Sequence, residues 1–149
     1  MSVTQRMSEK ILVVGAVDPD AYTQSATTYK TGIIDMSLHR RVLFIVMVGT
    51  MASTSTVDFD VYADTAANGA TMAKLTGKAI TQLTEAGTDS DKQALVEVTA
   101  EEVFAAGKRY IRGELLVSTA ASDAAVIALA SHSRYQPGTD ATSVDEIVA

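Results

Sequence analysis

The sequence predicts a mainly β protein: an antiparallel, jelly-roll-like β-sandwich of about eight strands, with one short connecting helix and an extended N-terminal arm. Three observations lead to this fold class. From residue 31 onward, β-rich runs are separated by turn residues roughly every 8–15 positions. Residues 56–64 alternate strictly between apolar and polar side chains. Only residues 100–106 carry a clear helix signal.

The N-terminal part, 1–30, is expected to be an arm or an edge segment. Residues 11–14 are apolar and precede Gly15, which suits an edge strand. Asp18-Pro19-Asp20 and the Thr- and Ser-rich residues that follow favour an irregular lead-in. The two alternatives remain open. The sandwich domain itself is expected over 31–137, and a polar C-terminal tail over 138–149.

The first half of the sandwich is predicted from three strands. Residues 32–36 form a brief first strand. Residues 41–51 are nearly all apolar and β-branched, which predicts a central strand buried on both faces. In 56–64, the residues Val57, Phe59, Val61 and Ala63 should face the core, and Asp58, Asp60, Tyr62 and Asp64 should face solvent.

The second half continues the pattern. Short strands are expected at 74–75 and 79–83, then at 93–98, 109–118 and 124–130. Thr99 and Glu102 form a capping-box pattern, and Gly107 provides a stop, so the helix should cover 100–106. Gly113 marks a bulge or a close approach inside its strand. The predicted core consists of Val42, Phe44, Val46, Phe59, Val61, Val96, Ile111, Leu115 and Val117.

Composition excludes several classes of function. The 12 Lys and Arg residues against 18 Asp and Glu give a net charge of −6, which argues against a nucleic-acid partner. The chain has no Cys, which excludes disulfides and thiolate chemistry. The apolar runs are far shorter than the about 20 residues of a membrane helix, and the first residues lack a signal-peptide pattern. We therefore expect a soluble, unexported chain with no membrane partner.

No catalytic constellation is visible. His39 and His132 stand far apart and lack companions at metal-ligand spacing. Asp58, Asp60 and Asp64 could bind calcium, but their spacing follows from strand alternation alone, so a solvated face is favoured. We expect no enzyme activity, no cofactor and no metal.

The candidate functional residues are therefore interface residues. His39, Arg40 and Arg41 form the sharpest basic cluster, either a solvated strand entrance or an anchor for an acidic neighbour. Tyr22 and Tyr29 lie in the N-terminal segment that could cross a neighbour. Apolar residues make up 47% of the chain, which favours a surface covered by another copy.

Three stretches, 31–51, 77–98 and 108–137, resemble small proteins encoded among the head genes of tailed bacteriophages, and within that group the capsid decoration (cement) proteins. Arg134, Tyr135 and Pro137 match a recurrent position near the end. The resemblance implies a homotrimer on the outer capsid surface of the virion, made in the host bacterial cytoplasm. It also implies the major capsid protein as partner, an N-terminal arm that reaches over neighbouring subunits, and no catalytic residue.

Two alternatives stay open. One is another phage structural component, in the tail or at the head–tail junction. The other is a carbohydrate-binding β-sandwich module, which is disfavoured because the chain has no Trp and its five Tyr are scattered.

Overall fold

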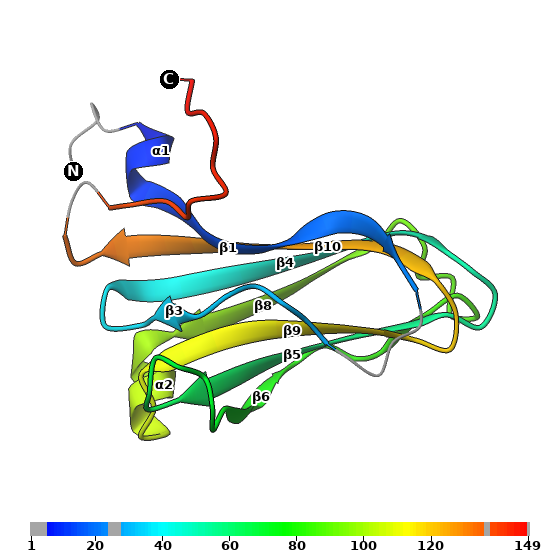
Figure 1. The fold of residues 1–149 in the computed structure, drawn as a ribbon, viewed down its shortest axis with the longest axis horizontal. Coiled ribbons are helices and arrows are strands. Elements are labelled where there is room, and N and C mark those ends of the chain that lie inside the picture. The colour runs from blue at the N-terminus through cyan, green and yellow to red at the C-terminus, as the bar shows by residue number, and fades with distance from the viewer. Residues whose placement is uncertain (1–5, 24–27, 136–137, 149) are drawn as a thin grey trace.

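Two antiparallel sheets face each other across one core in the computed structural model, which describes residues 6–23, 28–135 and 138–148 (Figure 1). The strands are β1 (Ile11–Tyr22), β2 (Tyr29–Lys30), β3 (Ile34–Asp35), β4 (His39–Met51), β5 (Thr56–Asp64), β6 (Ala73–Ala79), β7 (Leu83–Thr84), β8 (Gln93–Thr99), β9 (Tyr110–Ser118) and β10 (Ser122–Ser133). The helices are α1 (Met7–Lys10) and α2 (Ala100–Ala105). Among the described residues, no helix has the length and hydropathy needed to span a membrane.

The strand order is that of a jelly roll. One sheet runs β1-β10-β4-β8 and the other β2-β9-β5-β6, with β3 also paired to β9 and β7 to β5. If β2 and β3 are counted as one interrupted strand, and β6 and β7 as another, eight strands remain. Of these eight strands, the first pairs with the eighth, the second with the seventh, the third with the sixth and the fourth with the fifth. The chain therefore folds as one long hairpin that is rolled into two sheets. The predicted fold class is confirmed.

The core lies between the two sheets and contains all nine residues predicted for it. The rings of Phe44 and Phe59 meet across it, with centroids 5.4 Å apart and planes tilted by 51°. Gly113 of β9 lies against both rings: a Cβ at this position would stand 2.6 Å from Cζ of Phe59. The close approach predicted at Gly113 is therefore confirmed.

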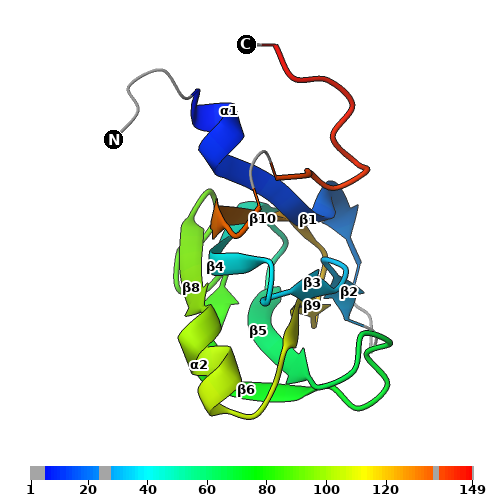
Figure 2. The same ribbon diagram turned by 90° about the vertical axis from the view of Figure 1, so that its left-hand side faces the viewer.

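The N-terminal segment is the edge strand, not an arm, over residues 11–22. β1 pairs with β10 along nearly its whole length, from Ile11 against Ser131 to Tyr22 against Ser122 (Figure 2). Leu12 is 2% exposed. Leu12 and Val17 are buried and Val14 packs against the core, and burying these apolar side chains stabilises the strand.

The C-terminal segment follows the free edge of β1. The backbone N–H of Val13 donates to Oδ1 of Asp140 at 2.7 Å, and the backbone N–H of Ala141 donates to the carbonyl oxygen of Val13 at 2.6 Å. These two bonds satisfy backbone groups of β1 that no neighbouring strand reaches. Residues 140–141 of the predicted tail are thus attached to the sandwich.

Two predictions about strand faces are wrong. β4 is central, as expected, but only Val42, Phe44, Val46, Val48 and Met51 are fully buried on it. The intervening side chains on its other face are half-buried or exposed, because they point away from the second sheet.

The second correction concerns β5. Asp64 does not face solvent but is fully buried, and its carboxylate accepts hydrogen bonds from the backbone N–H of Thr65 (2.7 Å) and of Thr71 (3.0 Å). These bonds hold the loop after β5 against the end of the strand. Burial acts to raise the pKa of Asp64, but the bonds from Thr71 and its neighbours outweigh it and lower the pKa below its ordinary value.

Candidate interface at the basic end of the sandwich

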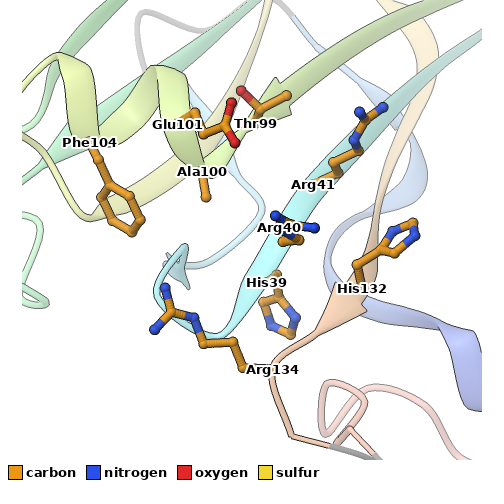
Figure 3. A pocket seen from close by; sticks show the side chains of 9 residues that line it. All are labelled: His39, Arg40, Arg41, Thr99, Ala100, Glu101, Phe104, His132 and Arg134. Carbon is orange, nitrogen blue, oxygen red and sulfur yellow. The ribbon is translucent and has the colours of Figure 1, made fainter.

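One end of the sandwich carries a hollow with basic walls, which we call the basic end (Figure 3). It is formed where β4 begins, where β10 ends and where α2 follows β8. The side chains that line it are His39, Arg40, Arg41, Thr99, Ala100, Glu101, Phe104, His132 and Arg134. Three guanidinium groups and two imidazoles thus share a hollow with a single carboxylate.

Antiparallel pairing of β4 with β10 brings the two halves of this cluster together. His39 at the start of β4 is paired with Ser133 at the end of β10, and Nδ1 of His39 lies 3.1 Å from Oγ of Ser133. The next residue, Arg134, donates its backbone N–H to the carbonyl oxygen of Leu38 at 2.9 Å. These bonds hold Arg134 beside the start of β4.

The turn that leads into β4 is held to the other sheet. The carboxylate of Asp35 accepts bonds from Nε (3.0 Å) and Nη2 (2.6 Å) of Arg109, and from the backbone N–H of Ser37 at 2.8 Å. The Arg109 guanidinium, together with the Ser37 bond, outweighs partial burial and lowers the pKa of Asp35 from 3.8 to about 2. This bidentate pair positions residues 35–38, and with them the entrance to β4.

The short helix α2 forms the opposite wall. Thr99 and Glu102 make the predicted capping box: Glu102 accepts from the backbone N–H of Thr99 at 2.9 Å, and Thr99 accepts from that of Glu102 at 3.3 Å. Nζ of Lys78 lies 2.7 Å from Oε1 of Glu102 and ties the helix to β6. Phe104 is 41% exposed at the rim of the hollow.

The arginines differ in how they are engaged. Arg41 pairs with Glu97 at 3.1 Å, and both side chains are more than half exposed, so this pair contributes under about 1 kcal/mol. Within the described part of the chain, neither Arg40 nor Arg134 takes part in an ion pair. The basic end therefore presents guanidinium groups that an acidic partner can reach.

The histidines do not form a metal or nucleophile site with these neighbours. Burial lowers the pKa of His39, despite the opposing charge of Asp35, and so favours the neutral form of its ring. Asp35 is already bound by Arg109 and Ser37 and does not orient the ring. In residues 6–23, 28–135 and 138–148, no group of three His, Cys, Asp or Glu side chains is placed to hold a metal ion.

The structure brings together four of the seven predicted interface residues: His39, Arg40, Arg41 and Arg134. Tyr135 is 74% exposed and lines a smaller hollow beside His39. Pro137 lies outside the described residues.

Tyr22 and Tyr29 are elsewhere. They stack on each other at the opposite end of the strands, with ring centroids 4.0 Å apart and planes tilted by 41°. The N-terminal segment therefore does not contribute these rings to the basic end.

Sequence reasoning missed the contribution of His132 and of α2. His132 lines the same hollow as His39 although 93 positions separate them. The β4–β10 register that unites them is a long-range pairing, and no local pattern in the sequence reports it.

Fold and site together define the chain as a jelly-roll β-sandwich with a basic hollow at one end. The sequence matches no protein-family model and no curated protein. Among solved structures, the chain is similar to chains from infectious bursal disease virus. A chain of the Gx strain shares 13% identity with a TM-score of 0.47, and the alignment covers 86% of this chain and 34% of that one.

A chain of the Gt strain shares 12% identity with a TM-score of 0.46 and the same coverage of 86% and 34%. A chain of the VP2 subviral particle shares 12% identity with a TM-score of 0.45, covering 85% of this chain and 33% of that one. The chain thus spans about one third of the length of these viral chains.

Proposed function

We propose that this chain is a structural protein of a tailed-bacteriophage virion, of the decoration or cement type, which binds the outer surface of the head as a homotrimer and stabilises the shell. The observation that carries the proposal is the basic end: Arg40, Arg41 and Arg134 gather at one end of a chain whose net charge is −6. A protein with this charge distribution is oriented by an acidic surface. The resemblance of residues 31–51, 77–98 and 108–137 to decoration proteins supplies the identity of that surface.

The partner is the major capsid protein, contacted through acidic side chains on the outside of the head. Guanidinium groups bind carboxylates in bidentate geometry, and Arg40 and Arg134 are exposed for it. The chain is made in the bacterial cytoplasm and resides on the outer capsid surface.

Stabilisation follows from linkage. A ligand that binds only the assembled shell raises the free energy of taking it apart. Three linked copies engage three sites at high effective concentration, so weak individual contacts suffice. Because β1 is part of the sandwich, attachment runs through the rigid basic end and not through an arm formed by residues 11–22.

The alternatives predict other locations or ligands. A tail or head–tail component would be found at the tail or at the portal vertex by antibody labelling of virions. A carbohydrate-binding module would need an aromatic platform, whereas the tyrosines are dispersed: Tyr62 lies under Lys74, Tyr110 under Arg109, and Tyr22 and Tyr29 on each other.

The test is binding to purified undecorated heads, measured by co-sedimentation. We expect the wild-type chain to bind, and Arg40→Glu combined with Arg134→Glu to reduce the affinity at least tenfold, because two attractive contacts become repulsive. Circular dichroism checks that the variant is folded.

Lys92→Glu is the matched control, since Lys92 is exposed just before β8, at the other end of the sandwich. It makes the same charge change as each of the two arginine substitutions and should leave head binding unaltered. A wild-type chain that ignores heads, or a double variant that binds as tightly as wild type, would overturn the proposal.

A further inference from the structure

The outer side of the sheet β1-β10-β4-β8 carries a cluster of aliphatic side chains over its centre, which we call the aliphatic face. Its residues alternate with the buried ones on each strand and stand beside one another through the sheet register: Leu43 pairs with Leu129, and Ile45 with Ile127. The face consists of Ile11, Val13 and Ala16 of β1, Ala125, Ile127 and Leu129 of β10, Leu43, Ile45 and Met47 of β4, and Leu95 of β8. None of these ten side chains is charged or aromatic.

The outer side of the other sheet is entirely different. It carries charged side chains that pair with one another, such as Lys74 with Asp60 at 2.7 Å and Arg112 with Glu114. Gln82 also donates to Asp58 at 2.8 Å. The same fold in the same chain thus has one outer surface suited to water and one that is not, so the aliphatic face is not a general property of this sandwich.

The face is partly exposed: seven of its side chains are half-buried and that of Ala125 is buried. Leu95 is 63% exposed and Met47 is 40% exposed. Four strands at roughly 4.8 Å spacing and five residues at about 3.4 Å rise give a face of about 330 Å². The largest apolar patch on a monomer is typically about 300–600 Å² and is often functional.

The rim of the face is polar. Arg41 and Glu97 border it at one end, and Asp123 at the other. A stable interface buries about 800 Å² on each partner, with an apolar centre and a polar rim. The aliphatic face supplies the centre of such an interface and these residues supply its rim.

We infer that the aliphatic face is the self-association surface of this protein and packs against a second copy of the chain. An uncharged surface without aromatic rings needs an apolar partner, and around a threefold axis the aliphatic faces of three neighbouring copies can meet and cover one another. The C-terminal segment is not that partner, because Asp140 and Ala141 bind along the edge of β1. The inference rests on the proposed function only in that both involve an oligomer.

The basic end and the aliphatic face have separate roles on this view. Charge at the basic end attaches the protein to an acidic surface, and apolar burial on the sheet joins the copies. Either surface can be altered while the other is left intact.

Size-exclusion chromatography with light scattering tests the inference on the full chain. We expect the wild type to be oligomeric, and Leu95→Lys and Met47→Lys each to shift it to monomer with an unchanged circular-dichroism spectrum, since both side chains already reach solvent. Ile33→Lys is the matched control: Ile33 is 36% exposed, lies between β2 and β3 beside Gly69, and should leave the oligomer intact.

A second measurement uses the absence of Cys in this sequence. Leu95→Cys introduces a unique thiol on the aliphatic face, and a short bis-maleimide should join two copies in high yield. Ile33→Cys should give no cross-link above background. This pair of variants remains informative if a lysine on the sheet prevents folding.

The outcomes separate this inference from the proposed function. A monomeric wild type, or an oligomer that survives both lysine variants, overturns the aliphatic face as the contact, and head binding is then judged on its own assay. If the wild type is an oligomer that Leu95→Lys dissociates, the aliphatic face is supported as the contact. If the same wild-type oligomer does not bind heads, the cement function is overturned.

Discussion

Gly113 lies against the rings of Phe59 and Phe44, where a Cβ would stand 2.6 Å and 3.1 Å from their nearest atoms. We expect Gly113→Ala to lower the free energy of unfolding by about 1–3 kcal/mol, because the ring of Phe59 must move in a packed core. Phe59→Ala alone should cost about 3–5 kcal/mol. Urea denaturation of the two single variants and the double variant measures both costs.

The double variant tests whether the ring of Phe59 is what excludes a side chain at position 113. Once Phe59 is removed, Gly113→Ala has room for its methyl group and should cost much less than in the wild-type background. Equal costs in both backgrounds would show that the ring is not what excludes a side chain at this position.

Asp35 makes stability depend on pH in the acid range. Bonds from Arg109 and Ser37 lower its pKa from 3.8 to about 2 in the folded chain. A lowered pKa in the folded state adds stability above the unfolded pKa, and this stability is lost as pH falls from about 4 to about 2. Urea midpoints at pH 5, 4, 3 and 2 should fall across this window.

In Asp35→Asn this part of the pH dependence should vanish, so the wild-type and variant curves converge at low pH. Asp123→Asn, at an exposed carboxylate, serves as the control and should keep the wild-type slope. A variant that keeps the full slope between pH 4 and 2 would contradict the role of the Asp35–Arg109 pair.

At the scale of elements, the stability of variants in β1 tests whether residues 11–22 form a strand of the sandwich or an arm. The side chain of Leu12 in β1 is 2% exposed. Leu12→Ala should therefore lower the free energy of unfolding by about 2–5 kcal/mol, measured by thermal or urea denaturation. The neighbouring Ile11→Ala should cost clearly less, because Ile11 points to the partly open outer side. A negligible loss of stability in both variants would indicate that residues 11–22 are an arm and not a strand of the sandwich.

Most strands and the helix could be predicted from local pattern. Residues 56–64 are β5 to the residue, and Thr99 with Glu102 marks the start of α2, because alternation and capping are properties of neighbouring residues. The continuous apolar run at 41–51 predicts a strand as well. It does not reveal what lies on each side, so the outer face of β4 was misjudged as buried core.

At the scale of the whole molecule, salt should separate the two surfaces. The Debye length falls from about 10 Å at 0.1 M to about 3 Å at 1 M ionic strength, so head binding through the basic end should weaken steeply as NaCl is raised. Self-association through the aliphatic face should persist, because apolar burial is not screened. Co-sedimentation and light scattering over the same salt series measure the two effects.

The opposite pattern, with head binding insensitive to salt and an oligomer that dissociates in it, would show that the roles of the two surfaces are reversed. Arg40→Glu with Arg134→Glu should flatten the salt dependence of any residual head binding. Lys92→Glu should keep the wild-type dependence.

The fold class, the nine core residues and the basic cluster at His39, Arg40 and Arg41 could be predicted from the amino-acid sequence alone, since periodicity, capping and composition are properties of near neighbours. The tertiary structure was needed to show that β1 forms the edge of a sheet, that His132 and Arg134 join the basic end, and that Tyr22 and Tyr29 do not. It also shows that the aliphatic side chains on the outer side of the sheet β1-β10-β4-β8 point away from the core. These features depend on strand pairings between distant parts of the chain, whose register is set by the packing of the whole sandwich and by no single segment.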